Sequence, residues 1–221
     1  MALRGMIFDL DGTLLDSMPM WHELDRRFLR EYGIDAPPDI SDIVKNMTIE
    51  QSSAYYAERF RLPVTAEQVA DRIEQLAADA YRYELQLKTG AEAFLSELHR
   101  RGIPCAIASV TYPKLLDAVL ERLQIKSYFR TVMTPPEGAN GKHTPVFYNA
   151  VLAEMGLTAP ETVVVEDALY AAETAKKMGF FTVGMKDDLD KEEWDGLEKI
   201  CRLTIHDWTA LNNAEFLNLF I

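Results

Sequence analysis

The sequence predicts an α/β protein with a doubly wound, Rossmann-like parallel sheet and an all-helical insertion. Two observations lead to this fold class. Short, continuous apolar runs recur along most of the chain with helical patterns between them, as expected when helices cover both faces of a parallel sheet. Residues 17–86 interrupt this alternation and show helix signals without a convincing strand. We therefore expect a core formed by residues 1–16 and 87–221 and a separate helical domain formed by residues 17–86.

Four apolar runs are predicted as buried strands, because none of them alternates apolar with polar residues. They cover residues 5–10, 104–109, 162–165 and 181–185. Helix signals lie between them: Pro113 suits a first helical position, and Gly156 and Gly179 are stop signals. The predicted core helices cover residues 91–101, 113–123, the segment from Thr144-Pro145 to Gly156, and 168–178.

The insertion carries several helix signals of its own. One apolar stripe ends at Gly33, and two capping boxes follow, each with a threonine three residues ahead of a glutamine. A second apolar stripe repeats at alternating steps of four and three residues, which predicts one long amphipathic helix. The first stripe is Trp21, Leu24, Phe28 and Tyr32, the capping boxes start at Thr48 and Thr65, and the second stripe is Val69, Ile73, Leu76, Ala80, Tyr83 and Leu87.

The charge balance limits the possible partners. The chain has 35 acidic residues against 23 Lys and Arg, a formal net charge of −12. This charge argues against nucleic acid as a partner, because polyanion binders need a basic face. It does not exclude small anions, since a local site can be positive within a negative protein.

The remaining composition indicates a soluble, cytoplasmic protein. No apolar run reaches the roughly 20 residues of a membrane-spanning helix, so no membrane partner is expected. Cys105 and Cys201 lack a metal-binding spacing, and we expect two reduced thiols. The sequence leaves the oligomeric state open, and a monomer is plausible.

The first predicted strand leads directly into Asp9-Leu10-Asp11-Gly12-Thr13. Ligands of open α/β sheets bind beyond the carboxyl ends of the strands. Alternation along the chain sends both carboxylates the same way, and two acids this close repel unless they share a cation or a proton. The alternative is a strand-end turn with both acids in water, and for this motif alone the two interpretations are nearly equal.

Three further features favour a ligand site. Ser109 ends the second predicted strand, where a hydroxyl and free backbone amides form a cradle for phosphate, although an isolated serine there is ordinarily a helix cap. Lys142 precedes a predicted helix, and a lone loop lysine is ordinarily solvated. Glu166-Asp167 ends the third strand, and adjacent acids there are costly without a cation. Together these residues predict a site for Mg²⁺ and phosphate, because Mg²⁺ prefers carboxylate and phosphate oxygens.

These four motifs resemble those of the haloacid dehalogenase-like superfamily in their order and spacing. The similarity is to the branch of phosphoglycolate phosphatases and β-phosphoglucomutases, whose helical cap is inserted after the first motif, and it spans essentially the whole chain. The resemblance implies a phosphatase for a small phosphorylated metabolite, with Mg²⁺ as cofactor and an aspartyl-phosphate intermediate. It also implies that residues 17–86 are the cap.

The resemblance also implies the role of each site residue. Asp9 would be the nucleophile, and Asp11 would be the general acid and base, with its main-chain carbonyl bound to Mg²⁺. The dehalogenases lack this second acid, so Asp11 points to phosphate esters as substrates. Ser109 and Lys142 would hold the phosphoryl oxygens.

For the metal, the resemblance implies Asp9 and Asp167 as carboxylate ligands, with Glu166 close to the ion or reaching it through water. Two positions depart from the family pattern. Ala168 stands where relatives often have serine, and the sequence after Lys142 reads His-Thr-Pro rather than the commoner Pro-x-Pro. Neither departure removes a catalytic group.

Substrate choice in this branch usually lies in the cap, where the candidate contacts are Trp21, His22, Lys45, Asn46 and Thr48. A helix-core position is favoured for Trp21 and a surface position for His22. The segment 45–48, which relatives fold over the site, is therefore the strongest candidate for substrate contact. Mutases carry an arginine where this chain has Ile49 and a histidine where it has Trp21, which favours hydrolysis. A hexose-phosphate mutase of the β-phosphoglucomutase kind stays open because His22 is one residue away, and a catalytically silent regulatory module is a third alternative.

Overall fold

The computed structural model describes residues 3–44, 47, 49–136, 140–186 and 191–220. The chain divides into two compact units, one formed by Met1–Ser17 and Gln86–Ile221 and the other by Met18–Leu85. The boundaries therefore lie one residue from the predicted ones, after residue 17 instead of 16 and after residue 85 instead of 86. We call the first unit the core unit and the second the helical unit.

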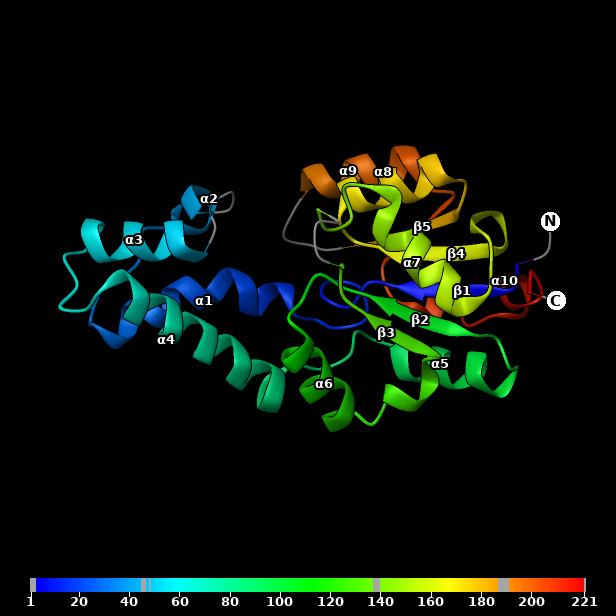
Figure 1. Ribbon diagram of the computed structural model, residues 1–221, viewed down its shortest axis with the longest axis horizontal. Helices are drawn as coiled ribbons and strands as arrows, with labels where there is room; N and C mark the ends of the chain where they lie inside the picture. The colour runs from blue at the N-terminus through cyan, green and yellow to red at the C-terminus, as the bar shows by residue number, and fades with distance from the viewer. Residues whose placement is uncertain (1–2, 45–46, 48, 137–139, 187–190, 221) are drawn as a thin grey trace. The chain divides into compact units, whose positions relative to one another are not determined.

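The core unit contains a parallel sheet, six-stranded within the described residues, with strand order β3-β2-β1-β4-β5-β6 (Figure 1). The predicted doubly wound fold is confirmed. The chain adds strands to one side from β1 to β3 and then continues on the other side from β4 to β6. The strands are β1 (Gly5–Phe8), β2 (Cys105–Ala108), β3 (Thr131–Met133), β4 (Thr162–Glu166), β5 (Phe181–Met185) and β6 (Leu203–Ile205).

Helices cover both faces of this sheet (Figure 1). On one face lie α5 (Ala91–Arg100) and α6 (Pro113–Arg122). On the other lie α7 (Pro145–Met155), α8 (Leu169–Met178) and α9 (Lys191–Ile200). The short α10 (Ala214–Leu217) lies near the chain ends, where Leu3 pairs with Phe220. Gly156 ends α7 and Gly179 ends α8, both with positive φ, as predicted.

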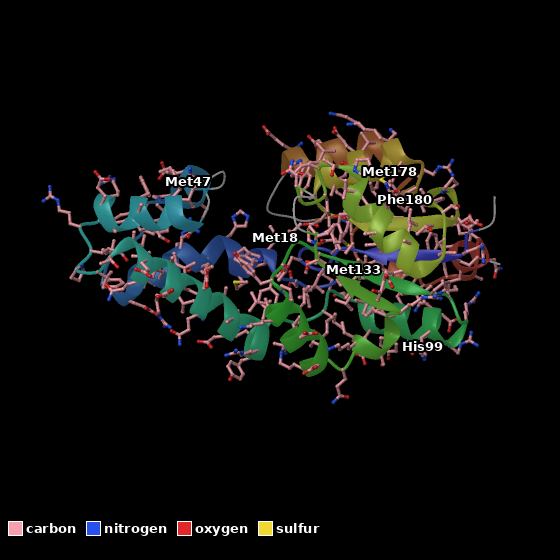
Figure 2. All side chains as sticks on the ribbon, in the orientation of Figure 1. Met18, Met47, His99, Met133, Met178 and Phe180 are labelled. Atoms are coloured by element: carbon pink, nitrogen blue, oxygen red, sulfur yellow. The ribbon has the colours of Figure 1, made fainter. Side chains whose placement is uncertain are left out.

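A continuous apolar core fills the space between α7 and the sheet. Phe147 and Val151 of α7 are fully buried against Ile7 of β1 and neighbouring strand residues. Phe180, in the turn before β5, belongs to the same cluster, and Met133 and Met178 pack against its edge (Figure 2). This packing fixes α7, and with it the loop that precedes it, against the centre of the sheet.

Two strands were missed in the sequence, and both are the edges of the sheet. β3 and β6 are three residues long, all of β3 is only partly buried, and β6 begins with an exposed leucine. An edge strand has one neighbour and needs less apolar surface, so neither forms the continuous apolar run that marked the central strands. Their pairing comes from contacts that are distant in sequence.

Trp208 is a core residue that the sequence did not reveal. Its side chain is fully buried, and its ring stacks on Phe94 of α5 with centroids 5.2 Å apart and lies 5.4 Å from Phe8 of β1. The indole Nε1 donates a hydrogen bond of 3.0 Å to the carbonyl oxygen of Thr13. Trp208 therefore anchors the loop that follows β1 to the apolar core.

The described residues of the helical unit form helices and loops, with no strand among them. The helices are α1 (Met18–Glu31), α2 (Ile40–Val44), α3 (Ile49–Arg59), α4 (Ala66–Asp79) and a π-helical turn, η1 (Ala80–Glu84). The predicted capping box at Thr65 is confirmed, with Gln68 N donating to the threonine hydroxyl at 3.3 Å and Gln68 Oε1 accepting from Thr65 N at 2.9 Å. The box predicted at Thr48 lies outside the described residues.

The long amphipathic helix was predicted to reach Leu87, and this end is wrong. Helical structure stops at Glu84, and Leu87 is extended and pairs antiparallel with Leu15. Hydrogen bonds from Asp16 N to Gln86 O (2.9 Å) and from Lys88 N to Leu14 O (2.8 Å) join the two segments where the chain leaves and re-enters the core unit. Backbone pairing between these segments replaces the last helical turn, which the apolar spacing alone could not reveal.

Neither cysteine forms a disulfide, and burial raises the pKa of the Cys105 thiol to about 12 and that of Cys201 to about 11. Both thiols are therefore protonated near neutral pH and are weak nucleophiles. Among the described residues, no helix combines the length and the apolar character that crossing a membrane requires.

Substitution of Gly90, which precedes α5, tests how tightly this glycine packs against the turn that contains Trp208 and Thr209. Its φ is +82°, and a Cβ there would lie 2.9 Å from the backbone nitrogen of Thr209. Gly102 has a similar φ of +71° with nothing within 4 Å of such a Cβ. We expect Gly102→Ala to lower the free energy of unfolding by about 1–2 kcal/mol through backbone strain alone. Gly90→Ala should lower the free energy of unfolding by about 1–3 kcal/mol more than Gly102→Ala does, because its Cβ also overpacks the turn. Urea denaturation measures both, and equal losses would contradict the close packing.

Candidate active site

The site lies where the strand order reverses. β1 pairs with β2 on one side and with β4 on the other, so the carboxyl ends of these three strands are neighbours. Asp9 follows the last residue of β1, Ser109 follows that of β2, and Glu166 is the last residue of β4. Such a reversal leaves a crevice beyond the strand ends because the flanking connections run to opposite faces. The parallel sheet thus brings together residues that are far apart in sequence.

The loop after β1 is held in one conformation by its own backbone. Gly12 has φ of +74°, which glycine adopts without strain, and its amide donates to the buried hydroxyl of Ser17 at 3.1 Å. The amides of Leu14 and Leu15 both donate to the carbonyl of Leu10. These bonds close a tight turn, which fixes the direction in which the acids on either side of Leu10 leave the sheet.

The same loop is tied to the end of β4. The hydroxyl of Thr13 donates to Asp167 Oδ1 at 3.1 Å, while the carbonyl of Thr13 accepts the bond from Trp208. Thr13 therefore connects one acidic motif to the other. The sequence gave no hint of this role beyond the place of Thr13 in the first motif.

Lys142 is the centre of the site. Only 2% of its side chain is exposed, and its ammonium donates to Asp9 Oδ1 and, at 2.8 Å, to Glu166 Oε1. The solvated lysine considered from the sequence is therefore excluded. Asn140 and Gly141, with φ of +51° and +58°, form the turn that directs the chain inward at this point.

The charges of this cluster shift one another's pKa. Burial raises the pKa of Asp9 well above its ordinary value, although Lys142 acts in the opposite direction, and burial also raises the pKa of Glu166. Burial and the charge of Glu166 raise the pKa of Asp167 to about 7. Burial alone would lower the pKa of the Lys142 ammonium, but Asp9 and Glu166 together raise it. The protein alone thus holds more negative charge here than Lys142 can neutralise.

Ser109 reaches the site, but its surroundings differ from the prediction. It is 1% exposed, and its amide donates to Met133 O at 3.1 Å, while the amide of Thr111 donates to the Ser109 hydroxyl, also at 3.1 Å. The expectation of free amides is therefore wrong for these two residues, because strand pairing and a local turn use them. The Ser109 hydroxyl accepts this bond and donates to none of the described residues, so its proton is available to a ligand.

Asp11 is held by a residue that the sequence did not single out. The hydroxyl of Thr111 donates to Asp11 Oδ2, which joins the loop after β2 to the loop after β1. Asp11 itself is only partly buried, in contrast to the fully enclosed Glu166. Asp11 thus lies at the more open side of the site, where a leaving group or water could approach it.

The acids fit a divalent cation. Among the described residues, Asp9, Glu166 and Asp167 each offer a carboxylate oxygen, and these oxygens lie within 4.8 Å of one another. Glu166 Oε2 is buried and accepts no hydrogen bond within the described part of the chain. Oxygen donors alone, with excess negative charge, suit Mg²⁺. Three carboxylates against one ammonium leave two negative charges, which one divalent ion would balance.

The cap candidates fall into two groups. Lys45, Asn46 and Thr48 lie outside the described residues, and nothing is described of the Ile49 side chain. Trp21 is partly buried on α1, with its ring edge-on to Tyr81 of the same unit at 6.3 Å, so it forms part of the packing of the helical unit. His22 is partly exposed, and its carbonyl accepts from Arg26 and Ser41.

Sequence reasoning missed three aromatic residues beside the site. Tyr148 is fully buried on α7 and donates to Glu166 Oε1 at 2.7 Å. Tyr170, near the start of α8, stacks on His143 with centroids 4.2 Å apart and planes at 21°. The helical position of Tyr148 within an apolar run made it indistinguishable from a core residue, while His143 was visible only as a departure from the family pattern.

Comparison with known proteins agrees with this geometry. The sequence profile of the family described as haloacid dehalogenase-like hydrolase matches residues 6–185. The chain belongs to the haloacid dehalogenase-like hydrolases. Its fold class and the resemblance drawn from the four motifs are thereby confirmed.

Relatives within the family include named phosphatases. A phosphorylated carbohydrates phosphatase of Thermotoga maritima is 25% identical over 80% of this chain and 82% of its own length. Hexitol phosphatase A of Escherichia coli is 30% identical over 76% of each chain. A phosphoglycolate phosphatase of Pectobacterium atrosepticum is 26% identical over 83% of this chain and 80% of its own length.

Solved structures show the same fold. The crystal structure of a putative β-phosphoglucomutase from Thermotoga maritima has a TM-score of 0.81 and 24% identity over 92% of this chain and 94% of its own. That of CbbY from Rhodobacter sphaeroides with xylulose-(1,5)bisphosphate has a TM-score of 0.74 and 18% identity over 99% of this chain and all of its own. At these identities the likeness describes the fold of this hydrolase rather than its substrate.

The raised pKa of Asp167 predicts an unusual pH dependence of stability. Its value of about 7 in the fold exceeds the value of about 4 for an unfolded aspartate, so between these values the folded chain binds more protons. The free energy of unfolding of the metal-free protein should therefore fall as the pH rises from about 4 to about 7, and the raised pKa values of Asp9 and Glu166 act in the same direction.

Urea denaturation in the presence of a chelator, at several pH values across this range, measures the effect. Asp167→Asn should flatten the slope, because it removes one of the titrating groups. Stability of the metal-free protein that rises across the same range would contradict the described electrostatics.

Proposed function

We propose that this hydrolase is a Mg²⁺-dependent phosphatase that cleaves a small phosphomonoester through an aspartyl-phosphate on Asp9. The observation that carries the proposal is the arrangement around Asp9. A buried ammonium is bonded to its carboxylate, two further carboxylates lie beside it, and an acid at the more open side follows two residues later. This set combines a nucleophile, a cation site and a proton carrier where the ends of β1 and β4 and the loop before α7 meet.

Each group meets one need of phosphoryl transfer. In the first step the Asp9 carboxylate forms a bond to phosphorus while the bond from phosphorus to the ester oxygen breaks, and Asp11 gives its proton to that oxygen. In the second step Asp11 takes a proton from water as the water oxygen forms a bond to phosphorus and the bond from phosphorus to Asp9 breaks, which releases phosphate and restores the Asp9 carboxylate. Lys142 and the Ser109 hydroxyl bind the phosphoryl oxygens, so charge and position are supplied before the reaction starts.

Asp11 and Asp9 lie in different environments, and Asp11 is the more exposed of the two. Thr111 fixes its orientation with a hydrogen bond to Oδ2. Asp9, by contrast, is buried, and the Lys142 ammonium that donates to it favours the carboxylate form that attack on phosphorus requires. The same residue type thus serves in two roles because the two environments differ.

The acids Asp9, Asp167 and Glu166 would hold Mg²⁺, with the main-chain carbonyl of Asp11 as a further ligand. When bound, the ion would lower the charge repulsion between these acids and the incoming phosphate. This is the physical reason for expecting an inactive enzyme without metal: three carboxylates and one ammonium repel an anion.

The proposed substrates are sugar phosphates and similar phosphomonoesters of a metabolite. The support is sequence similarity to the relatives named phosphorylated carbohydrates phosphatase and hexitol phosphatase A. A panel of hexose phosphates, hexitol phosphates and phosphoglycolate, with release of inorganic phosphate as the readout, ranks them. The same assay separates a mutase, which would yield an isomer without net release of phosphate. The proposal also places the protein in the cytoplasm.

Asp9→Asn tests the nucleophile. We expect turnover to fall at least 10³-fold, since an amide is a poor nucleophile toward phosphorus and general positioning remains. Asp16→Asn is the matched control, because Asp16 belongs to the same loop but is exposed, and it should retain activity. Steady-state phosphate release measures both. Turnover of Asp9→Asn near that of the unaltered enzyme would exclude the aspartyl-phosphate route.

Removal of the metal tests the charge argument. With a chelator, phosphate release should fall to background and return when Mg²⁺ is added in excess. Calorimetry with Mg²⁺ alone should detect a site in the unaltered protein, and Asp167→Asn should weaken it at least tenfold because a carboxylate ligand is lost. Full activity in the presence of chelator would contradict the metal dependence.

A further inference from the structure

Tyr148 is a buried polar residue to which the proposed mechanism assigns no role. It lies on α7 with its side chain fully buried, and its ring packs against Phe180 with centroids 5.5 Å apart. Its hydroxyl donates a 2.7 Å hydrogen bond to Oε1 of Glu166, itself 1% exposed. A bond of this length from a neutral donor to a buried carboxylate is of the stronger, charge-assisted kind.

Tyr148 and Lys142 share one acceptor. Lys142 donates to the same Oε1 of Glu166 at 2.8 Å and also to Asp9. Glu166 and Asp9 therefore compete for one ammonium in a buried environment, where each carboxylate needs compensation. The Tyr148 hydroxyl provides part of that compensation for Glu166.

The two oxygens of Glu166 thus differ. Oε1 accepts two hydrogen bonds, whereas Oε2 accepts none from the described residues although it is buried. Two donors, from different elements, thus hold the same carboxylate oxygen.

We propose that Tyr148 is a positioning residue for phosphoryl transfer, which holds Glu166 so that the Lys142 ammonium remains directed at Asp9 and the phosphoryl group. This inference rests on the proposed function, because it assigns Lys142 to the phosphoryl oxygens. Without the hydroxyl, Lys142 must compensate Glu166 alone and moves away from Asp9. A role in packing alone would lower stability without this effect on the ammonium.

Tyr148→Phe is the test, because it removes the hydroxyl and keeps the ring. Its kcat/KM for a phosphate ester should fall about tenfold, the effect expected from loss of one charge-assisted hydrogen bond. The Kd for inorganic phosphate, measured by calorimetry with Mg²⁺ present, should rise several-fold, since phosphate binds the same ammonium. Tyr128→Phe is the matched control, a tyrosine of the core unit that packs on His99, and it should change neither quantity.

The phosphate Kd is then measured in a double-mutant cycle with Glu166→Gln. A neutral amide no longer competes for Lys142, so Tyr148→Phe should have little further effect on the phosphate Kd in that background. An equal loss in both backgrounds would mean that Tyr148 acts independently of Glu166 and would overturn the inference. So would a Tyr148→Phe protein with a lower Tm and unchanged kcat/KM and phosphate Kd.

Failure of this inference can be distinguished from failure of the proposed function. If Asp9→Asn abolishes turnover and Tyr148→Phe changes neither readout, the phosphatase stands and the positioning role falls. If Asp9→Asn keeps its turnover, the proposed function falls, while the phosphate-binding cycle still reports on Tyr148 and Lys142. Should Tyr148→Phe not fold, Tyr148→Met, which also lacks the hydroxyl, provides the same two readouts.

Discussion

The buried ammonium of Lys142 is the interaction on which the rest of the site depends. It lies between Asp9 and Glu166, and each partner comes from a different part of the chain. A buried charge without partners is prohibitively costly, and buried acids without a cation are equally unfavourable. The ends of β1 and β4 and the loop before α7 must therefore meet for any of them to be stable in this position. Lys142 does not compensate all of the negative charge of these acids, and a bound divalent metal ion would balance the remainder.

Hydrogen bonds from neutral residues then fix the orientation of the charged side chains. Trp208 supports Thr13 from the core, and Thr13 in turn bonds to Asp167. Thr111 orients Asp11, and Tyr148 does the same for Glu166. Each of these donors belongs to a different segment, so each acidic side chain is fixed from outside its own loop. Such support lets two aspartates only two residues apart have different environments and, we propose, different functions.

Much of the core was predictable because parallel strands are buried on both faces and leave a simple apolar signature. The central strands and the helix stops at Gly156 and Gly179 were found in this way. The edge strands β3 and β6 were not, because one neighbour suffices for them and their residues are only partly buried. The end of the helix after α4 was placed too late, since pairing of Leu87 with Leu15 overrides a favourable helical spacing.

The sequence by itself determined the fold class, the order of the four motifs and the types of residue at the strand ends, because these follow from local patterns and from strand topology. Only the tertiary structure decided which atoms meet. That Lys142 is buried between two acids, that strand pairing occupies the Ser109 amide, and that Tyr148 reaches Glu166 from an apolar helix all depend on packing between distant segments. Hydrophobic periodicity records which side of a helix or strand is buried, but it does not record what that side touches.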